Sequence, residues 1–152
     1  STVVFVERKR GNLTVDWDKT CSALNAFLDD KKCTLFVVTG FLASNHDGEQ
    51  VLLVRNCSDY SSAIFAKCFQ ASALFIWKDL DGVYSADPAH VRSAFPIPQL
   101  SYESALELAY FGASVIHPKT IAPVMELGIP IMIKNALDPK AKGTVMSNDT
   151  SA

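Results

Sequence analysis

The chain has 152 residues, of which 49% are hydrophobic and 20% are charged, and its formal net charge is −2. This composition is typical of a globular protein with one core, and the charge gives no electrostatic reason to expect a nucleic-acid partner. No apolar run reaches the roughly 20 residues that span a bilayer, and the first basic residues follow the first apolar run, the reverse of a signal peptide. We therefore expect neither nucleic acid nor a membrane as a partner.

Short apolar segments alternate with helical patterns along the chain. The patterns predict strands at 2–7, 13–15, 34–41, 51–54, 74–77, 129–134 and 143–146, and helices at 16–29, 58–71, 101–112 and from 118 to about 128. Residues 42–50 and 79–88 are expected to be loops. Thr34–Phe41 is continuously apolar and β-branched, which is typical of a strand covered on both faces. Strands separated by helices predict an α/β fold with a mainly parallel sheet, helices on both faces and ligands beyond the carboxyl ends of the strands.

The cysteines and histidines show no metal-binding pattern. Cys21, Cys33, Cys57 and Cys68 have no CxxC spacing, so we expect reduced thiols that behave as small hydrophobic residues, with structural zinc or disulfides as the less favoured alternatives. Reduced thiols indicate a cytoplasmic location. The three histidines also lack ligand spacing, and we expect no metal site built from the protein.

The segment 55–60 combines a cation with the start of a predicted helix. A helix that begins at Ser58 points free backbone N–H groups forward, which suits an anion, and Arg55 adds a two-pronged donor for carboxylate or phosphate. Asp59 lies in the first turn, where a carboxylate is favoured by the helix dipole. The alternative is ordinary helix capping with a solvated arginine.

The segment 77–88 begins at the end of a predicted strand, and its loop contains a cation, three acids, a glycine turn and a tyrosine. Such a loop could hold a ribose or a base by hydrogen bonds and stacking. The alternative is a polar turn with one packed aromatic side chain. Neither a Walker loop nor a GxGxxG motif is present, so a nucleotide would bind without either phosphate-binding loop.

Taken together, these segments resemble the aspartokinases. Residues 55–61 (RNCSDYS) resemble the pattern R-N-G-S-D-Y-S, and residues 76–88 (IWKDLDGVYSADP) resemble I-W-T-D-V-D-G-V-Y-S-A-D-P. Residues 38–41 (VTGF), 100–113 and 117–123 (HPKTIAP) follow further family motifs in the same order. The resemblance extends from about residue 34 to residue 146, and the tail pattern is most similar to the bifunctional aspartokinase–homoserine dehydrogenase branch.

The resemblance implies a fold, a reaction and a set of ligands. Residues 1–146 would be the C-terminal portion of an amino-acid kinase domain, a partial carbamate kinase-like αβα sandwich, followed by a polar tail at 147–152. The family transfers the γ-phosphoryl group of ATP, with Mg²⁺, to the β-carboxylate of L-aspartate, in the biosynthesis of lysine, threonine and methionine. By resemblance, Arg55, Ser58 and Asp59 bind aspartate. Asp59, also the catalytic candidate, would engage the substrate amine or help to order the catalytic lysine. Lys78 and Asp79 would hold the nucleotide, and Tyr84 would pack near the adenine.

Departures from the family pattern leave the activity of this chain open. The family segment K-F-G-G-T-S is absent, Cys57 replaces a glycine, Lys78 a threonine, and Ala89 and Ser114 replace an arginine and a lysine. The absent segment and the changes at Ala89 and Ser114 remove cations near the phosphates, and Cys57 adds a side chain where the backbone must approach the ligand closely. The isolated chain is therefore expected to be inactive, although Lys78 could replace one lost cation. The alternative is a catalytically degenerate module for nucleotide binding, regulation or assembly. A related kinase with another acceptor, such as glutamate, fits the motifs less well. We also expect a homo-oligomer, or association with the remainder of a kinase domain.

Overall fold

The computed structural model describes residues 4–9, 12–29, 34–53, 58–110 and 116–148. Their helices are α1 (Trp17–Asp29), α2 (Ser58–Cys68), α3 (Tyr102–Tyr110) and α4 (Pro118–Met125). Their strands are β1 (Val6–Lys9), β2 (Asn12–Val15), β3 (Leu42–Ser44), β4 (Gln50–Leu52), β5 (Leu74–Lys78), β6 (Gln99–Ser101), β7 (Ile131–Asn135) and β8 (Thr144–Ser147). No helix within these ranges is long and apolar enough to cross a membrane.

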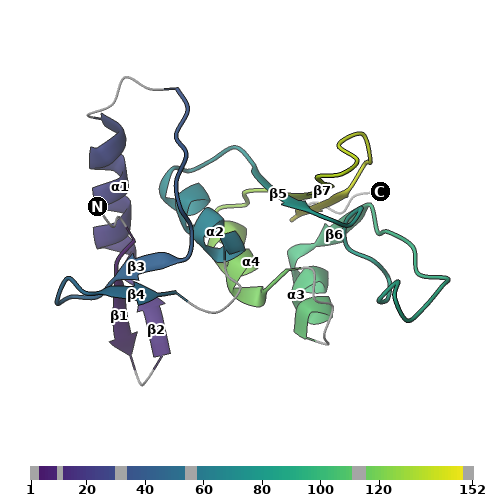
Figure 1. Ribbon diagram of the computed structural model, residues 1–152, viewed down its shortest axis with the longest axis horizontal. Coiled ribbons are helices and arrows are strands. Elements are labelled where there is room, and N and C mark those ends of the chain that lie inside the picture. Colours follow the sequence, from purple (N-terminus) through teal and green to yellow (C-terminus); the bar gives the residue numbers. More distant parts are fainter. Residues whose placement is uncertain (1–3, 10–11, 30–33, 54–57, 111–115, 149–152) are drawn as a thin grey trace.

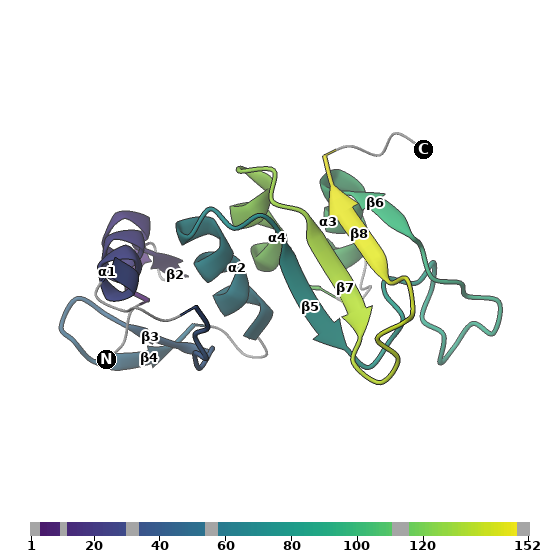
Figure 2. The same ribbon diagram turned by 90° about the horizontal axis from the view of Figure 1, so that it is seen from above.

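The largest sheet has four strands in the order β5-β7-β8-β6. The pairs β5–β7 and β6–β8 are parallel, and β7–β8 is antiparallel. Helices α3 and α4 lie on one face of this sheet (Figure 2). The predicted α/β fold with a mainly parallel sheet is confirmed, whereas β6 was not predicted because its three residues are too short to show a period.

Helix α2 lies between two hydrophobic cores and contributes side chains to both. Ala63 and Ala66 face the core formed by the four-stranded sheet with α3 and α4. Ile64 and Cys68 face a second core, formed with β1, β2, β3 and α1. The helix therefore joins the two small antiparallel sheets, β1–β2 and β3–β4, to the larger sheet (Figure 1).

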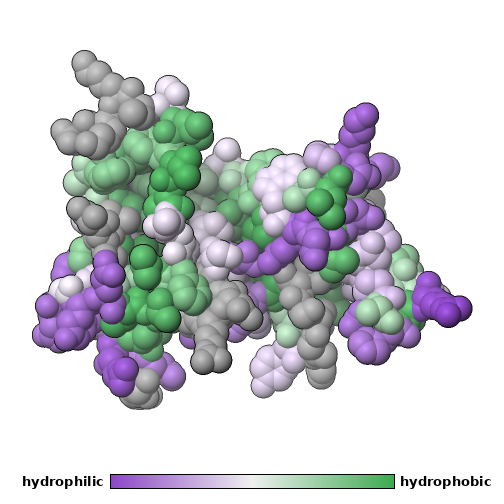
Figure 3. Space-filling view, in the orientation of Figure 1, coloured by the Kyte–Doolittle hydropathy of each residue, from purple (hydrophilic) through white to green (hydrophobic). Residues whose placement is uncertain are grey.

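The prediction of a doubly covered strand at 34–41 is wrong. Residues 35–40 form no regular structure, and Leu35 and Val37 are 80% and 95% exposed. A strand buried on both faces requires neighbouring strands and helices, and no described strand pairs with this segment. Figure 3 shows the hydrophobic surface that results along the extended stretch after α1. The loop predicted at 42–50 is also partly wrong, because Leu42–Ser44 forms β3 and pairs with β4.

The prediction of four reduced thiols is wrong for two of the cysteines. Cys21 of α1 and Cys68 of α2 form a disulfide, with their Cα atoms 4.8 Å apart. The two residues are 47 positions apart in the chain, so only the packing of α1 against α2 brings them together, and no local motif could indicate the pair. The disulfide also removes the argument for a reducing compartment from the cysteines. Cys33 and Cys57 lie outside the described residues.

Two helices begin at the capping residues that the sequence predicted, whereas one proline lies further inside its helix than expected. Asp16 accepts a hydrogen bond from the backbone N–H of Lys19, which confirms the predicted cap of α1. Ser101 accepts in the same way from Ser104 at the start of α3. Pro123 was expected near the first turn of its helix but lies in the second turn of α4, where it removes one backbone hydrogen bond.

Two glycines and one threonine hold the loop after β5 against β8. Thr144 is buried, accepts a hydrogen bond from the backbone N–H of Val83 at 2.8 Å, and donates one to the carbonyl of Ile97 at 2.6 Å. A Cβ atom at Gly82 would lie 2.3 Å from the Thr144 hydroxyl oxygen, and one at Gly143 would lie 2.1 Å from a backbone oxygen of β7. These contacts fix the loop that carries the candidate site.

Candidate functional site

The candidate site lies where the carboxyl ends of β5 and β7 approach the first turn of α2. Lys78 and Asn135, the last residues of the two strands, are partners in the parallel register. Figure 2 shows the arrowheads of β5 and β7 and the beginning of α2 at the same end of the molecule. Ligands of parallel α/β sheets bind at this end, because loops that follow adjacent strands converge there.

An ion pair joins α2 to the end of β5. The Lys78 ammonium donates a hydrogen bond to the Asp59 carboxylate over 2.7 Å. The side chains are only 30% and 16% exposed, so water screens the pair less than it screens an ion pair on the open surface. Asp59 also lies in the first turn of α2, where the helix dipole favours its negative charge. The two segments that the sequence singled out are therefore in direct contact.

The residues just before β3 also contact the beginning of α2. The buried Ser61 hydroxyl accepts a hydrogen bond from the backbone N–H of Phe41 at 2.7 Å. A Cβ atom at Gly40 would lie 3.3 Å from the Ser61 side chain, so a larger residue would have to displace it. Phe41 has a φ of 78°, a strained conformation for a residue with a side chain, and such strain is concentrated at functional sites.

Side-chain and backbone hydrogen bonds hold the loop after β5. Asn135 donates to the Asp81 carboxylate at 2.8 Å, and the backbone N–H of Ala136 donates to the carbonyl of Lys78 at 2.7 Å. The sequence alone assigns no role to Asn135, nor to Ser61 at the end of the motif 55–61, because each acts through a contact between residues distant in the chain. Asp79, in contrast, is exposed and adjacent to the ion pair.

The distal part of this loop is closed by backbone pairing. Ile97 donates to the carbonyl of Val83, and Ser85 donates to the carbonyl of Phe95. Tyr84, which is half-buried, lies in the chain between Val83 and Ser85. Within the described ranges, no hydrogen bond or ion pair joins Tyr84 to the Asp59–Lys78 pair.

The exposed end of the loop contains one perturbed carboxyl group. The backbone N–H of Ala89 and the ring of His90 both contact Asp87, at 2.8 and 3.0 Å. The hydrogen bond from Ala89, followed by that from His90, lowers the pKa of the Asp87 carboxyl. Asp87 is therefore held in a turn, consistent with the turn-forming role that acids often have in loops.

The structure places some of the predicted site residues and leaves others outside its description. Ser58 is exposed at the start of α2, next to Asp59. Arg55, Cys57 and Ser114 lie outside the described residues. Among those that are described, no group of three or more histidine, cysteine, aspartate or glutamate side chains could hold a metal ion.

The comparison with family models is decisive for the classification. The model described as "Amino acid kinase family" matches residues 3–135. The chain belongs to the amino acid kinase family. It is 48% identical over 121 residues to a bifunctional aspartokinase/homoserine dehydrogenase from Haemophilus influenzae, covering 80% of this chain and 15% of that protein.

Solved structures agree with the sequence relatives of this amino acid kinase chain. E. coli aspartokinase III in complex with aspartate and ADP superimposes with a TM-score of 0.88 at 32% identity, over 99% of this chain and 34% of the other. Clostridium acetobutylicum aspartate kinase gives 0.82 at 31% identity, over 98% and 33%. The chain therefore spans about one third of these kinases, and about 15% of the bifunctional relative.

Proposed function

We propose that this chain supplies the acceptor-binding and nucleotide-binding rim of an aspartokinase. The observation that carries the proposal is the Asp59–Lys78 ion pair, because it joins the helix start assigned to the acceptor with the strand end assigned to the nucleotide. The likeness to an aspartokinase whose structure contains aspartate and ADP supports the same assignment.

In the proposed reaction, a β-carboxylate oxygen of aspartate attacks the γ-phosphorus of ATP. A new oxygen–phosphorus bond forms, and the bond between the γ-phosphorus and its bridging oxygen breaks, which releases ADP. Such a transfer depends mainly on positioning and on neutralising the charge of the phosphoryl group. The protein must therefore hold two anionic substrates side by side, and this requires cations at the rim.

Each site residue has one proposed task in this arrangement. Arg55 pairs with a substrate carboxylate, and Ser58 adds a hydroxyl at the start of α2. Asp59 accepts a hydrogen bond from the substrate ammonium group. Lys78 and Asp79 hold the nucleotide, and Tyr84 packs near the adenine.

The ion pair also favours a second candidate function. As long as Lys78 neutralises Asp59, this carboxylate is partly satisfied within the protein and is less available to a substrate ammonium group. Ala89 further leaves the loop without the arginine of the family pattern. A module that binds nucleotide without phosphoryl transfer would have these properties.

Calorimetric titration and a phosphoryl-transfer assay distinguish the two functions. MgATP and L-aspartate are titrated separately and together into the chain, into Asp59→Asn and into the control Asp47→Asn, whose side chain lies in the exposed β3–β4 turn. We expect Asp59→Asn to weaken aspartate binding about tenfold, which corresponds to one charge-assisted hydrogen bond. The control should bind as the wild type does. Nucleotide binding without aspartate binding or turnover would favour the nucleotide-binding module over the aspartokinase rim. If neither MgATP nor L-aspartate binds, both functions are refuted.

A further inference from the structure

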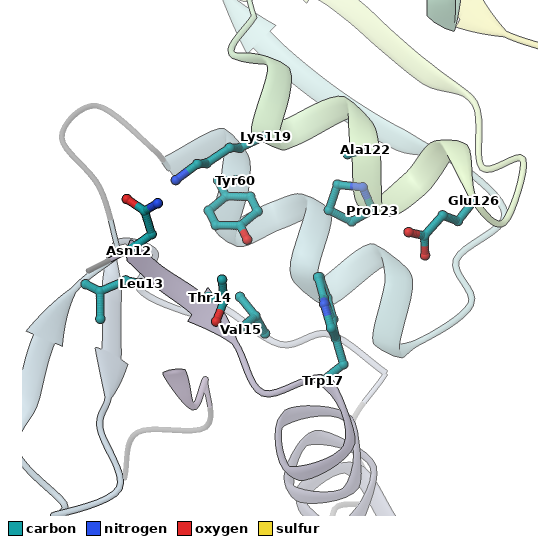
Figure 4. A pocket seen from close by; sticks show the side chains of 10 residues that line it. All are labelled: Asn12, Leu13, Thr14, Val15, Trp17, Tyr60, Lys119, Ala122, Pro123 and Glu126. Atoms are coloured by element: carbon teal, nitrogen blue, oxygen red, sulfur yellow. The ribbon is translucent and has the colours of Figure 1, made fainter. Parts of the chain in front are cut away.

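A pocket on another side of α2 is not used by the proposed function. It has a volume of about 500 Å³, within the range of small-molecule sites, and it lies between β2, the first residue of α1, α2 and one face of α4. Figure 4 shows Tyr60 and Trp17 between the strand and α4, with Lys119 and Glu126 toward opposite ends of the helix. Tyr60 follows Asp59 directly, and consecutive helical residues point in different directions. The pocket is thus separate from the Asp59–Lys78 pair.

The walls of the pocket suit an apolar body with a flat shape. Val15 and Pro123 are buried, and the aromatic rings of Trp17 and Tyr60 are half-buried. The ammonium group of Lys67 lies 4.4 Å from the centre of the Trp17 ring. This cation covers part of the indole and also forms an ion pair with Glu126. The aromatic wall is therefore held in place by contacts that exist without a ligand.

The charges at the rim of the pocket favour an anion. Glu126 is already neutralised by Lys67. Lys119 lines the pocket, is exposed, and forms no ion pair within the part of the chain that the structure describes. It belongs to the first turn of α4, where the helix dipole adds to the attraction for negative charge. One available cation beside an apolar wall matches a ligand with one negative charge at the end of an aromatic or branched body.

We propose that this pocket binds an amphipathic carboxylate. Its carboxylate group pairs with Lys119, and its apolar body lies against Trp17, Tyr60 and Pro123. The proposal does not depend on the function proposed for the Asp59–Lys78 site, because no residue is shared between the two sites.

The two tryptophans of the chain allow a test with an internal control. Trp17 lines the pocket, whereas Trp77 on β5 is 51% exposed and does not line it. The probes are 4-phenylbutyrate and its uncharged amide, titrated into ¹⁵N-labelled chain while the indole N–H resonances are recorded by NMR. Trp77→Phe assigns the two signals. For a probe of this size the dissociation constant should be on the order of 1 mM.

The expected result is a saturable shift of the Trp17 signal with little change at Trp77. The amide should bind about threefold to fivefold more weakly, and Lys119→Gln should weaken the carboxylate by the same factor, which is typical of an exposed ion pair. Lys140→Gln, in the exposed loop before β8, should bind as the wild type does. A larger shift at Trp77, equal affinities for acid and amide, or an unchanged affinity in Lys119→Gln would each overturn the proposal. The dispersion of the remaining amide signals shows in the same spectra that Lys119→Gln is folded.

Discussion

Removing the disulfide between α1 and α2 should lower the stability of the chain by several kcal/mol. The bond closes a loop of 47 residues, and the loop-closure entropy of the unfolded chain then corresponds to about 4 kcal/mol at 25 °C. Domains of this size are stable by only about 5–15 kcal/mol. The bond joins α1 to α2 within the second core, so its loss should loosen the packing of α1 against α2 first.

Urea unfolding followed by circular dichroism measures this effect. The oxidised wild type, the wild type with dithiothreitol, and Cys21→Ser with and without dithiothreitol form a complete cycle. We expect the reduced wild type and Cys21→Ser to unfold with similar free energies, up to about 4 kcal/mol below the oxidised wild type. Dithiothreitol should have no further effect on Cys21→Ser.

Thiol titration provides an independent control for the same pair. In denaturant without reductant, Cys21→Ser should show one more reactive thiol than the oxidised wild type, because the substitution releases Cys68. One fewer thiol, or equal stability of the wild type with and without dithiothreitol, would refute the reasoning.

Two further substitutions test the packing that supports the site. Thr144→Ala should destabilise the chain by about 2–4 kcal/mol in urea unfolding, because Val83 N–H and Ile97 C=O both lose a buried partner. Thr144→Ser keeps the hydroxyl and should retain most of the stability. Equal losses of stability in the two variants would contradict the role of the hydroxyl. The Tyr102 hydroxyl donates to the carbonyl of Ile129, and burial raises the pKa of this phenol above its ordinary value of 10.0. Its contribution is therefore fully present below pH 10 and is lost as the pH rises through the higher folded pKa. Tyr102→Phe should lose about 1–3 kcal/mol at pH 8 and show a smaller difference from the wild type in strong alkali; a difference independent of pH would count against this interpretation.

The sequence predicted the elements whose patterns are local. The spacing of Trp17, Cys21 and Leu24 predicted α1, and its Asp16 cap was readable because a cap contacts a residue only three positions away. The family motifs predicted the chemistry of the α2 start and the β5 end. The contact between Asp59 and Lys78, however, is a product of the fold, since the two residues come from different elements.

The errors arise where the outcome depends on partners. The segment 34–41 has the composition of a central strand, yet composition does not supply neighbouring strands, and the segment remains extended and exposed. Hydrophobic residues are exposed on this segment and on β5, and such surfaces favour association. Association of the chain with itself or with the remainder of a kinase domain stays a prediction. The Cys21–Cys68 disulfide and the bond from Phe41 to Ser61 are likewise contacts between distant positions.

The most direct test of the proposed acceptor–nucleotide rim is the MgATP affinity of Lys78→Thr, measured by calorimetry beside the wild type and Lys140→Thr. If the strand end holds the nucleotide phosphates, Lys78→Thr should bind MgATP about tenfold more weakly, as expected for loss of one partly buried cation, and Lys140→Thr should be unchanged. Equal dissociation constants for all three proteins would show that the end of β5 does not hold the nucleotide.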